Sequence, residues 1–274
     1  MLNTEILIEE EGTIFINKDI FDINYMLETY PFRDEQLNQM ITHSIDIKEN
    51  KAPKKMLLKG GFATGKTSTM KLYFKRIEKE YSNVICTYIN CQIMDSENEI
   101  FNEIYQNLFN YETKQGSHTK WLYTKIVNKL RKEKKILILG LDDIDSIKNK
   151  KELNNLLSKI LRVNEAYKDV QIGLIMAGNP IFQLKLDPKV STVFNKVSIP
   201  FPNYSKNQIR YILKLRCQEG FYQGVISEEV LENVVDKTYD EGNLRTGITL
   251  LSIAGENAEE NNSMKILKKH LELD

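Results

Sequence analysis

The sequence predicts an α/β fold, a doubly wound parallel sheet followed by a small all-helical domain. Continuous apolar runs at residues 136–141 and 172–176 are typical of parallel strands that helices cover on both faces. These runs alternate with stretches of helical periodicity, which favours a doubly wound sheet. After Pro200 only helical stretches remain. We therefore expect a core with an N-terminal collar over residues 1–200 and a helical lid over residues 201–274.

The expected elements follow one another along the chain. A helical pattern over about 33–47 belongs to the collar. The short strand Met56–Lys59 leads through a glycine-containing turn into a helix from Lys66 to about Glu80. The remaining core elements are a buried strand over Val84–Asn90, a helix that begins with a capping box of Ser96 and Glu99, and a helix over about 119–132. The lid helices are expected to begin at Ser205, at Ser227 and after Gly242.

The composition is that of a soluble globular protein. Hydrophobic residues make up 41% and charged residues 28% of the 274 residues, which is too apolar for a disordered chain. Lys+Arg and Asp+Glu both number 38, so no overall charge attracts nucleic acid and any DNA contact must be local. No apolar run approaches the roughly 20 residues that span a bilayer, and the acidic N-terminus is unlike a signal peptide. We expect a cytoplasmic protein with no membrane partner.

The cysteines and histidines indicate no metal centre or disulfide framework. Cys86, Cys91 and Cys217 are odd in number and lack C-x-x-C spacing, which fits a reducing cytosol. The three histidines are scattered without the spacing of metal ligands, and no serine or cysteine triad is indicated. The chemistry must therefore come from another motif.

A phosphate-binding loop is the most specific motif in the sequence. Between the first strand and its helix, residues 60–67 read G-G-F-A-T-G-K-T and satisfy G-x-x-x-x-G-K-[ST]. Backbone N–H groups of such a turn and the positive end of the helix cradle phosphates, Lys66 reaches the β- and γ-phosphates, and the Thr67 hydroxyl binds Mg²⁺. Ala63 stands where many such loops have a third glycine, so binding should differ slightly. The residues expected to bind ATP or ADP with Mg²⁺ are Gly60, Gly61, Phe62, Ala63, Thr64, Gly65, Lys66, Thr67 and Ser68.

Acidic residues follow the apolar run at 136–141, where the sequence continues as L-D-D-I-D. Because the carboxyl ends of parallel strands meet at one edge of the sheet, Asp142 is expected beside the phosphate-bound Mg²⁺. The alternative is that Asp143 and Asp145 form a surface turn.

Asn179 follows the apolar strand that ends at Met176. At that place it can orient an attacking water molecule or contact the γ-phosphate from the neighbouring strand. An Asn before Pro180 would by itself signal only a turn. The spacing of Asn179 from Asp142 favours the functional interpretation.

Together these motifs resemble the archaeal replication initiators of the origin-recognition and cell-division-control type, a branch of the AAA+ ATPases. The resemblance runs from about Ile14 to Asp274 and rests on the order and spacing of the motifs. It implies an AAA+ P-loop NTPase core with a helical lid, which converts ATP and water to ADP and phosphate. Besides the phosphate loop, the matching segments are I-F-I-N-K-D-I-F-D-I-N-Y, P-F-R-D-E-Q-L, Y-I-N-C, L-D-D-I-D, A-G-N-P, L-D-P-K-V, F-P-N-Y, I-L-K-L-R and G-N-L-R.

The resemblance assigns roles to five further residues. Tyr204 of F-P-N-Y and Arg216 of I-L-K-L-R correspond to residues that line the nucleotide site, and Arg245 of G-N-L-R corresponds to a lid arginine that reaches the γ-phosphate. Asp143 stands where the family usually has a glutamate that activates water, and Lys189 of L-D-P-K-V stands where an arginine acts on a neighbour's ATP. Aspartate reaches about one methylene less far, and lysine lacks the planar fork of arginine. Both departures predict slow hydrolysis.

The resemblance also bears on DNA. Family members contact DNA through a winged-helix domain and a helical insertion in the core. This chain stops where the winged helix would begin, so it is either naturally short or part of a longer protein. The insertion corresponds to about Met94–Asn110, which carries Glu97, Glu99 and Glu103 and no Lys or Arg. Because such a segment cannot release counterions from phosphates, this chain should bind duplex DNA weakly and without sequence preference.

The favoured function is an initiator-like ATPase that uses Mg²⁺–ATP binding and slow hydrolysis as a conformational switch. The lid would close on the triphosphate through Arg245 and relax after hydrolysis. The switch would control assembly with DNA, with replication proteins or with further copies through the AAA+ interface. One alternative is a nucleotide-dependent adaptor of a plasmid, mobile element or defence system with little or no hydrolysis. Another is a transposition-regulator ATPase that forms filaments on DNA, which would not be expected to contain F-P-N-Y followed by I-L-K-L-R.

Overall fold

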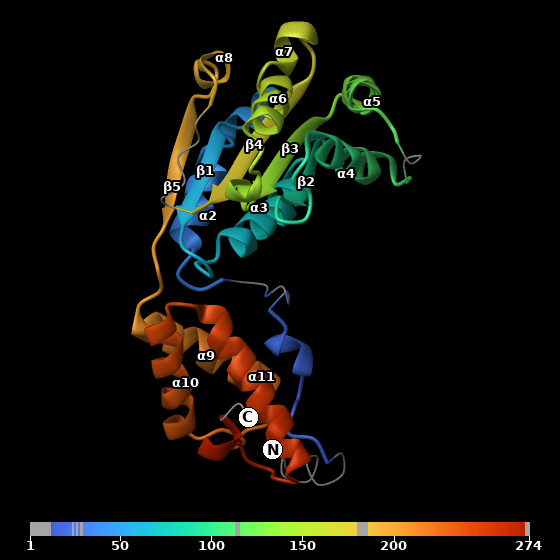
Figure 1. The fold of residues 1–274 in the computed structure, drawn as a ribbon. Coiled ribbons are helices and arrows are strands. Elements are labelled where there is room, and N and C mark those ends of the chain that lie inside the picture. Colours follow the sequence, from blue (N-terminus) through green and yellow to red (C-terminus); the bar gives the residue numbers. More distant parts are fainter. Residues whose placement is uncertain are drawn as a thin grey trace. The chain divides into compact units, whose positions relative to one another are not determined.

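The computed structural model describes residues 12–23, 25, 27, 30–112, 116–179 and 186–271. The chain divides into two compact units (Figure 1). Each unit has its own hydrophobic core. The α/β unit consists of Arg33–Gly61 and Gly65–Phe201, and the helical unit consists of Phe62–Thr64 together with the described residues of Met1–Phe32 and Pro202–Asp274.

The α/β unit is built on a parallel sheet, which has five strands among the described residues in the order β2-β3-β4-β1-β5. The four pairings between neighbouring strands are parallel. β3 is buried along its whole length, as its continuous apolar sequence requires. The predicted α/β fold with a parallel sheet is confirmed. The strands are β1 (Lys55–Gly60), β2 (Val84–Asn90), β3 (Ile136–Asp142), β4 (Gln171–Gly178) and β5 (Lys196–Phe201).

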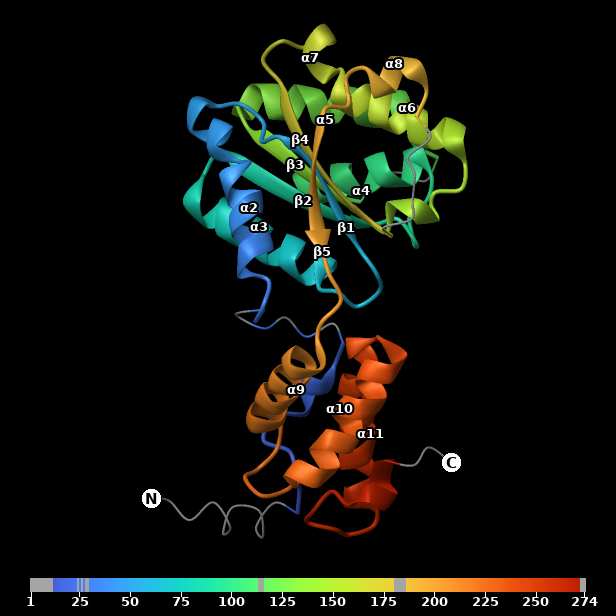
Figure 2. The same ribbon diagram turned by 90° about the vertical axis from the view of Figure 1, so that its left-hand side faces the viewer.

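Helices cover both faces of this sheet (Figure 2). On the α3 face, Gly140 of β3 leaves room for the side chains of Met70 and Phe74, whose atoms would lie 2.7 Å from a Cβ at this position. α2 (Asp34–Thr42) and α3 (Lys66–Glu80) pack on this face, and α4 (Glu97–Phe109), α5 (Thr119–Glu133) and α6 (Lys150–Leu161) pack on the other. The shorter segments are η2 (Ile45–Glu49), η3 (Ile144–Ser146), α7 (Val163–Ala166) and α8 (Pro188–Ser191).

The strand β5 was not predicted from the sequence. Its residues alternate between exposed and buried positions, so no continuous apolar run announces it. It also contains Pro200, which is tolerated because β5 is an edge strand that pairs with β1 alone among the described strands. The carbonyl of Pro200 accepts a hydrogen bond from Nε2 of Gln36 at 3.2 Å.

The helical unit contains α9 (Lys206–Gly220), α10 (Glu228–Glu241) and α11 (Leu244–Glu260), with the short segments η1 (Lys18–Phe21) and η4 (Lys268–Leu271). The predicted helix starts are confirmed. Ser205 and Ser227 accept hydrogen bonds from the first turns of α9 and α10, and Gly242 ends α10 in the left-handed conformation. Ion pairs tie α9 to α10, namely Lys206–Asp236, Arg210–Glu232 and Lys214–Glu228.

The N-terminal segment belongs to the helical unit, which corrects the expectation that residues up to about 32 are part of the α/β core. The rings of Phe15 and Phe21 pack on Phe221 with centroids 5.1 and 4.5 Å away. The backbone N–H of Ile16 donates to the carbonyl of Gly220 at 2.8 Å. The apolar residues of this segment therefore complete the core of the lid helices.

Candidate functional site

The predicted phosphate loop connects β1 to α3. Gly65 adopts φ +84°, a left-handed conformation that glycine enters without steric cost, and α3 begins at the next residue. Because Gly65 has no side chain to cap the helix, the first-turn amides present the positive end of α3 to the loop. Ala63 has φ +52°, so the alanine occupies backbone conformation that favours glycine. The loop therefore holds two left-handed residues, one of which is the alanine.

The ammonium group of Lys66 lies inside this loop. Lys66 is 8% exposed, and its Nζ donates to the carbonyls of Gly60 at 2.9 Å and Gly61 at 2.6 Å. A buried cation enclosed by backbone at a helix N-terminus suits an anionic ligand such as a phosphate.

Asp142 lies beside the first turn of α3. Its carboxylate is 1% exposed, and Oδ2 accepts a hydrogen bond from the Thr67 hydroxyl at 2.5 Å. The same oxygen accepts a bond from the Tyr88 hydroxyl at 3.0 Å, and Oδ1 accepts one from the backbone N–H of Asp143 at 3.1 Å. Burial and the charge of Asp142 raise the pKa of Tyr88, so its hydroxyl stays protonated and donates.

A hydroxyl and a carboxylate oxygen this close together are the oxygen ligands that Mg²⁺ prefers. Within the described part of the chain, no group of three or more His, Cys, Asp or Glu side chains could hold a metal ion. Mg²⁺ commonly binds through one or two protein oxygens, with phosphate and water completing its shell. The residues present therefore fit a metal ion that arrives with a nucleotide.

Asp143 follows Asp142 in the left-handed conformation, with φ 49°, and precedes η3. Its Oδ2 accepts a hydrogen bond from Nε2 of Gln92 at 3.0 Å. The sequence interpretation assigned no role to Tyr88 or Gln92, although Tyr88 begins the Y-I-N-C segment that carried part of the resemblance and Gln92 follows it directly. The position of β2 beside β3, which pairs Asn90 with Asp142, brings them to the site.

Asn179 follows β4 at the same edge of the sheet as Asp142. The register pairs Leu141 of β3 with Met176, and Lys59 of β1 with Gly178. Asn179 therefore comes between the acidic end of β3 and the start of the phosphate loop. Pro180, which completes the A-G-N-P segment, lies outside the described residues.

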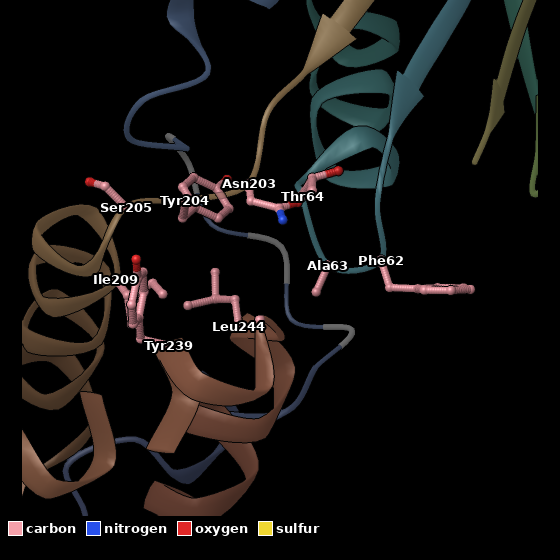
Figure 3. A pocket seen from close by; sticks show the side chains of 10 residues that line it. Phe62, Ala63, Thr64, Asn203, Tyr204, Ser205, Ile209, Tyr239 and Leu244 are labelled. Carbon is pink, nitrogen blue, oxygen red and sulfur yellow. The ribbon is translucent and has the colours of Figure 1, made fainter. Parts of the chain in front are cut away.

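Tyr204 lines a cavity of about 400 Å³ in the helical unit (Figure 3). The phenol rings of Tyr204 and Tyr239 and the side chain of Leu244 give it an apolar wall, whereas the Phe62 side chain points away and is 67% exposed. The lining residues are Phe62, Ala63, Thr64, Asn203, Tyr204, Ser205, Ile209, Tyr239, Gly242 and Leu244.

Three further expected site residues do not line this cavity. Arg216 is 6% exposed and donates through NH1 to the carbonyl of Ile20, and burial lowers the pKa of its guanidinium. Arg245 is exposed in the first turn of α11. Lys189 is exposed on α8, and its carbonyl accepts a hydrogen bond from NH2 of Arg162 at 2.6 Å. The structure thus brings Asp142 together with Thr67, which is next to Lys66 in the sequence, and it places Arg216 against the N-terminal segment.

Cys91 and Cys217 are buried free thiols. Burial raises the pKa of Cys91 and of Cys217 to about 12, and the charge of Asp142 adds to the effect on Cys91. Both thiols therefore stay protonated at neutral pH.

No helix in the described ranges is long and apolar enough to cross a membrane.

Comparisons with known proteins agree with the two units. Residues 50–186 match the family model of the AAA domain, and residues 210–273 match that of the Cdc6 AAA+ ATPase-type lid domain. The ORC1-type DNA replication protein 2 of Methanothermobacter thermautotrophicus is 36% identical over 270 residues, which are 98% of this chain and 71% of that protein. The protein of the same name from Methanosarcina mazei is 34% identical over 274 residues, covering 99% and 73% of the two chains.

Solved structures show the same fold. The Aeropyrum pernix ORC1 protein in complex with DNA superimposes with a TM-score of 0.83 at 26% identity, over 94% of this chain and 68% of that chain. The Aeropyrum pernix ORC2 protein, described as ADPNP-ADP complexes, gives a TM-score of 0.81 at 20% identity over 94% and 71%. With the sequence motifs, the fold and the family matches in agreement, the chain belongs to the family of ORC1-type DNA replication proteins within the AAA+ ATPases.

Proposed function

We propose that this protein binds Mg²⁺–ATP in the loop Gly60–Thr67, hydrolyses it slowly, and uses the difference between its ATP and ADP states to control assembly with DNA or replication partners. The observation that carries this proposal is the contact between Thr67 and Asp142 beside the buried Lys66. Lys66 would supply a cation for the phosphates, and Thr67 and Asp142 would supply two oxygen ligands for the metal ion within the same site.

The cavity lined by Tyr204, Tyr239 and Leu244 is the place we propose for the base. Aromatic and aliphatic side chains bind a planar heterocycle by burying its faces. The loop residues Ala63 and Thr64 also line this cavity, and they are continuous with the residues proposed to bind the phosphates. Arg216 would then act indirectly, by fixing the N-terminal segment through the Ile20 carbonyl.

Hydrolysis would use Asp143 as the general base. Its carboxylate takes a proton from a water molecule whose oxygen attacks the γ-phosphorus, the bond to the β-phosphate oxygen breaks, and ADP and phosphate leave. Asn179 would orient this water. When bound, Mg²⁺ neutralises charge on the phosphate oxygens. Gln92 holds the Asp143 carboxylate, and the short side chain of aspartate limits its reach, which supports slow turnover.

The conformational switch would depend on Arg245. It is exposed in the first turn of α11, and the family resemblance of G-N-L-R supports this role. Loss of that phosphate would remove the attraction and release the lid. Lys189 is the residue we propose to contact the nucleotide of a neighbouring copy, with weaker effect than an arginine.

The departures at Asp143 and Lys189 also favour a second candidate, a nucleotide-dependent adaptor with little or no hydrolysis. Calorimetry with ADP and a non-hydrolysable ATP analogue, followed by single-turnover hydrolysis of ATP, tests both candidates. Binding of both nucleotides with slow release of phosphate supports the switch, binding without hydrolysis supports the adaptor, and absence of binding refutes both.

A further inference from the structure

Tyr88 lies outside the phosphate loop and contacts Asp142, the proposed metal ligand. Its hydroxyl donates to Oδ2 of Asp142 at 3.0 Å, the same oxygen that accepts from Thr67. Tyr88 lies on β2 opposite Gly140, two residues before Asn90, which pairs with Asp142. Because side chains two apart on a strand share a face, Tyr88 and Asp142 both project toward α3.

Helix α3 contacts both members of this pair. Thr67 in its first turn binds Asp142, and one turn later Lys71 places its ammonium 4.5 Å from the centre of the Tyr88 ring. Residues four apart lie on one side of a helix, so α3 contacts the carboxylate and the phenol with a single face. The Tyr88 ring is thereby fixed between Lys71 and Asp142.

An ionised carboxylate can accept hydrogen bonds or bind a metal ion at about four lone-pair positions. In Asp142, Tyr88 and Thr67 occupy positions on Oδ2, and the Asp143 amide occupies one on Oδ1. The Thr67 hydroxyl would exchange its bond when it ligates Mg²⁺, whereas the Tyr88 hydroxyl approaches from the neighbouring strand and need not move. Tyr88 is therefore the side-chain donor that can hold the carboxylate in one orientation before and after the metal ion binds.

We propose that Tyr88 is a positioning residue for Mg²⁺ binding, which holds the Asp142 carboxylate in the orientation that the metal ion requires. This proposal rests on the proposed function, in which Asp142 lies beside a nucleotide-bound metal ion. Removal of the Tyr88 hydroxyl should weaken the binding of the metal ion and leave the binding of metal-free nucleotide unchanged. The reason is that, in the described contacts, the hydroxyl is connected to the phosphate loop only through Asp142.

The test compares wild type with Tyr88→Phe by two measurements on the whole chain. Calorimetry gives the affinity for ADP in EDTA and across a series of Mg²⁺ concentrations, and electron paramagnetic resonance gives the binding of Mn²⁺ in the presence of ADP. We expect equal affinity for ADP in EDTA and an increase of about 10-fold in the metal concentration at half saturation, the lower end of what loss of a residue behind a metal ligand costs. The matched control is Tyr123→Phe, which removes a phenol that donates to the Lys159 carbonyl at 3.3 Å.

An unchanged metal dependence in Tyr88→Phe overturns the proposal, and so does an equal loss of ADP affinity with and without metal, which indicates a general structural role. If circular dichroism shows that Tyr88→Phe does not fold, Lys71→Met tests the proposal instead. This variant keeps the Tyr88 hydroxyl and removes the cation that contacts the Tyr88 ring. It should raise the half-saturating metal concentration by about 2- to 5-fold, the size of an exposed cation–π contact, and no change would overturn the proposal. Failure of wild type to bind ADP under any condition would instead refute the proposed function.

Discussion

The hydroxyl of Thr67 donates a hydrogen bond to the carboxylate of Asp142 at 2.5 Å, although 75 positions separate the two residues in the chain. Thr67 lies in the first turn of α3, and Asp142 is the last residue of β3. The sheet order places β4 between β3 and β1, so the parallel arrangement brings the end of β3 to the edge where the phosphate loop begins. In the proposed function, a metal ion and the phosphates would meet at this contact.

Substitution of Lys66 by alanine should remove most of the nucleotide affinity. The ammonium is buried in the loop and would face the β- and γ-phosphates. A hydrogen bond to a charged group contributes about 1.5–3 kcal/mol, which corresponds to about 10- to 150-fold in affinity. Calorimetry with ADP and Mg²⁺ measures the change, with Lys79→Ala as the control because Lys79 is exposed in the last turn of the same helix. Equal affinity in wild type and Lys66→Ala would show that the loop assignment is wrong.

Lengthening Asp143 to glutamate should accelerate hydrolysis. The aspartate is held by Gln92 at 3.0 Å, and one more methylene would bring the carboxylate closer to the attacking water. The measurement is single-turnover release of phosphate at saturating ATP, with Asp143→Asn as a variant that should lose the activity since an amide cannot accept the proton. A fast wild type would contradict this prediction, as would an Asp143→Glu protein that binds ATP normally and is no faster.

The packing of the N-terminal segment on α9 predicts a coupled pair of substitutions. A Cβ added at Gly220 would lie 2.3 Å from the ring of Phe21, so Gly220→Ala should lower the free energy of unfolding by about 1–3 kcal/mol through overpacking. In a Phe21→Ala background the same substitution should cost much less, because the ring is absent. Urea denaturation of wild type, both single variants and the double variant gives the coupling energy. Additive effects would mean that the segment does not pack on the helix in solution.

The stability of the helical unit should fall below neutral pH because of His270. This side chain is 2% exposed, and burial together with Lys269 lowers its pKa, so the folded protein binds a proton less readily than the unfolded chain. As pH falls below about 6.5, the ordinary pKa of histidine, the unfolded state gains the proton and the free energy of unfolding decreases. Above that pH both states are neutral and the contribution is constant.

Urea unfolding at pH 5.5 and 7.5 measures this dependence. His270→Asn keeps an acceptor for the Leu267 amide, which donates to Nδ1 at 3.1 Å, and should reduce the difference between the two pH values. His118→Gln, at an exposed position, should retain the difference. The same pH dependence in wild type and His270→Asn would exclude His270 as its source.

Duplex DNA should bind to this chain weakly and without sequence preference. In α4, Glu97 is buried and paired with Lys159, Glu99 completes the capping box, and the segment from Met94 to Asn110 supplies no cation for phosphates. The dissociation constant should lie in the range typical of non-specific binding, about 10⁻⁴ to 10⁻⁶ M at physiological salt. Fluorescence anisotropy with origin-like and scrambled duplexes measures it. Tight binding that prefers one sequence would show that the AAA+ core itself reads bases.

The sequence by itself determined the parallel sheet, the glycine-containing turn between β1 and α3 and the helix starts, because these depend on local patterns. Continuous apolar runs identify buried strands, a glycine turn before a helix identifies the loop, and Ser205 and Ser227 satisfy the first amides of their helices. The edge strand β5 escaped prediction because its burial alternates and Pro200 interrupts it.

Only the tertiary structure decided which distant residues meet. The N-terminal segment packs on the lid helices since Phe15 and Phe21 complete a core that α9 and α11 leave open, and no local pattern records that choice. Tyr88 and Gln92 reach Asp142 and Asp143 only because β2 pairs with β3 in a register that no short stretch of sequence fixes. Local chemistry sets the elements, whereas burial of apolar surface over the whole chain sets the partners of each side chain.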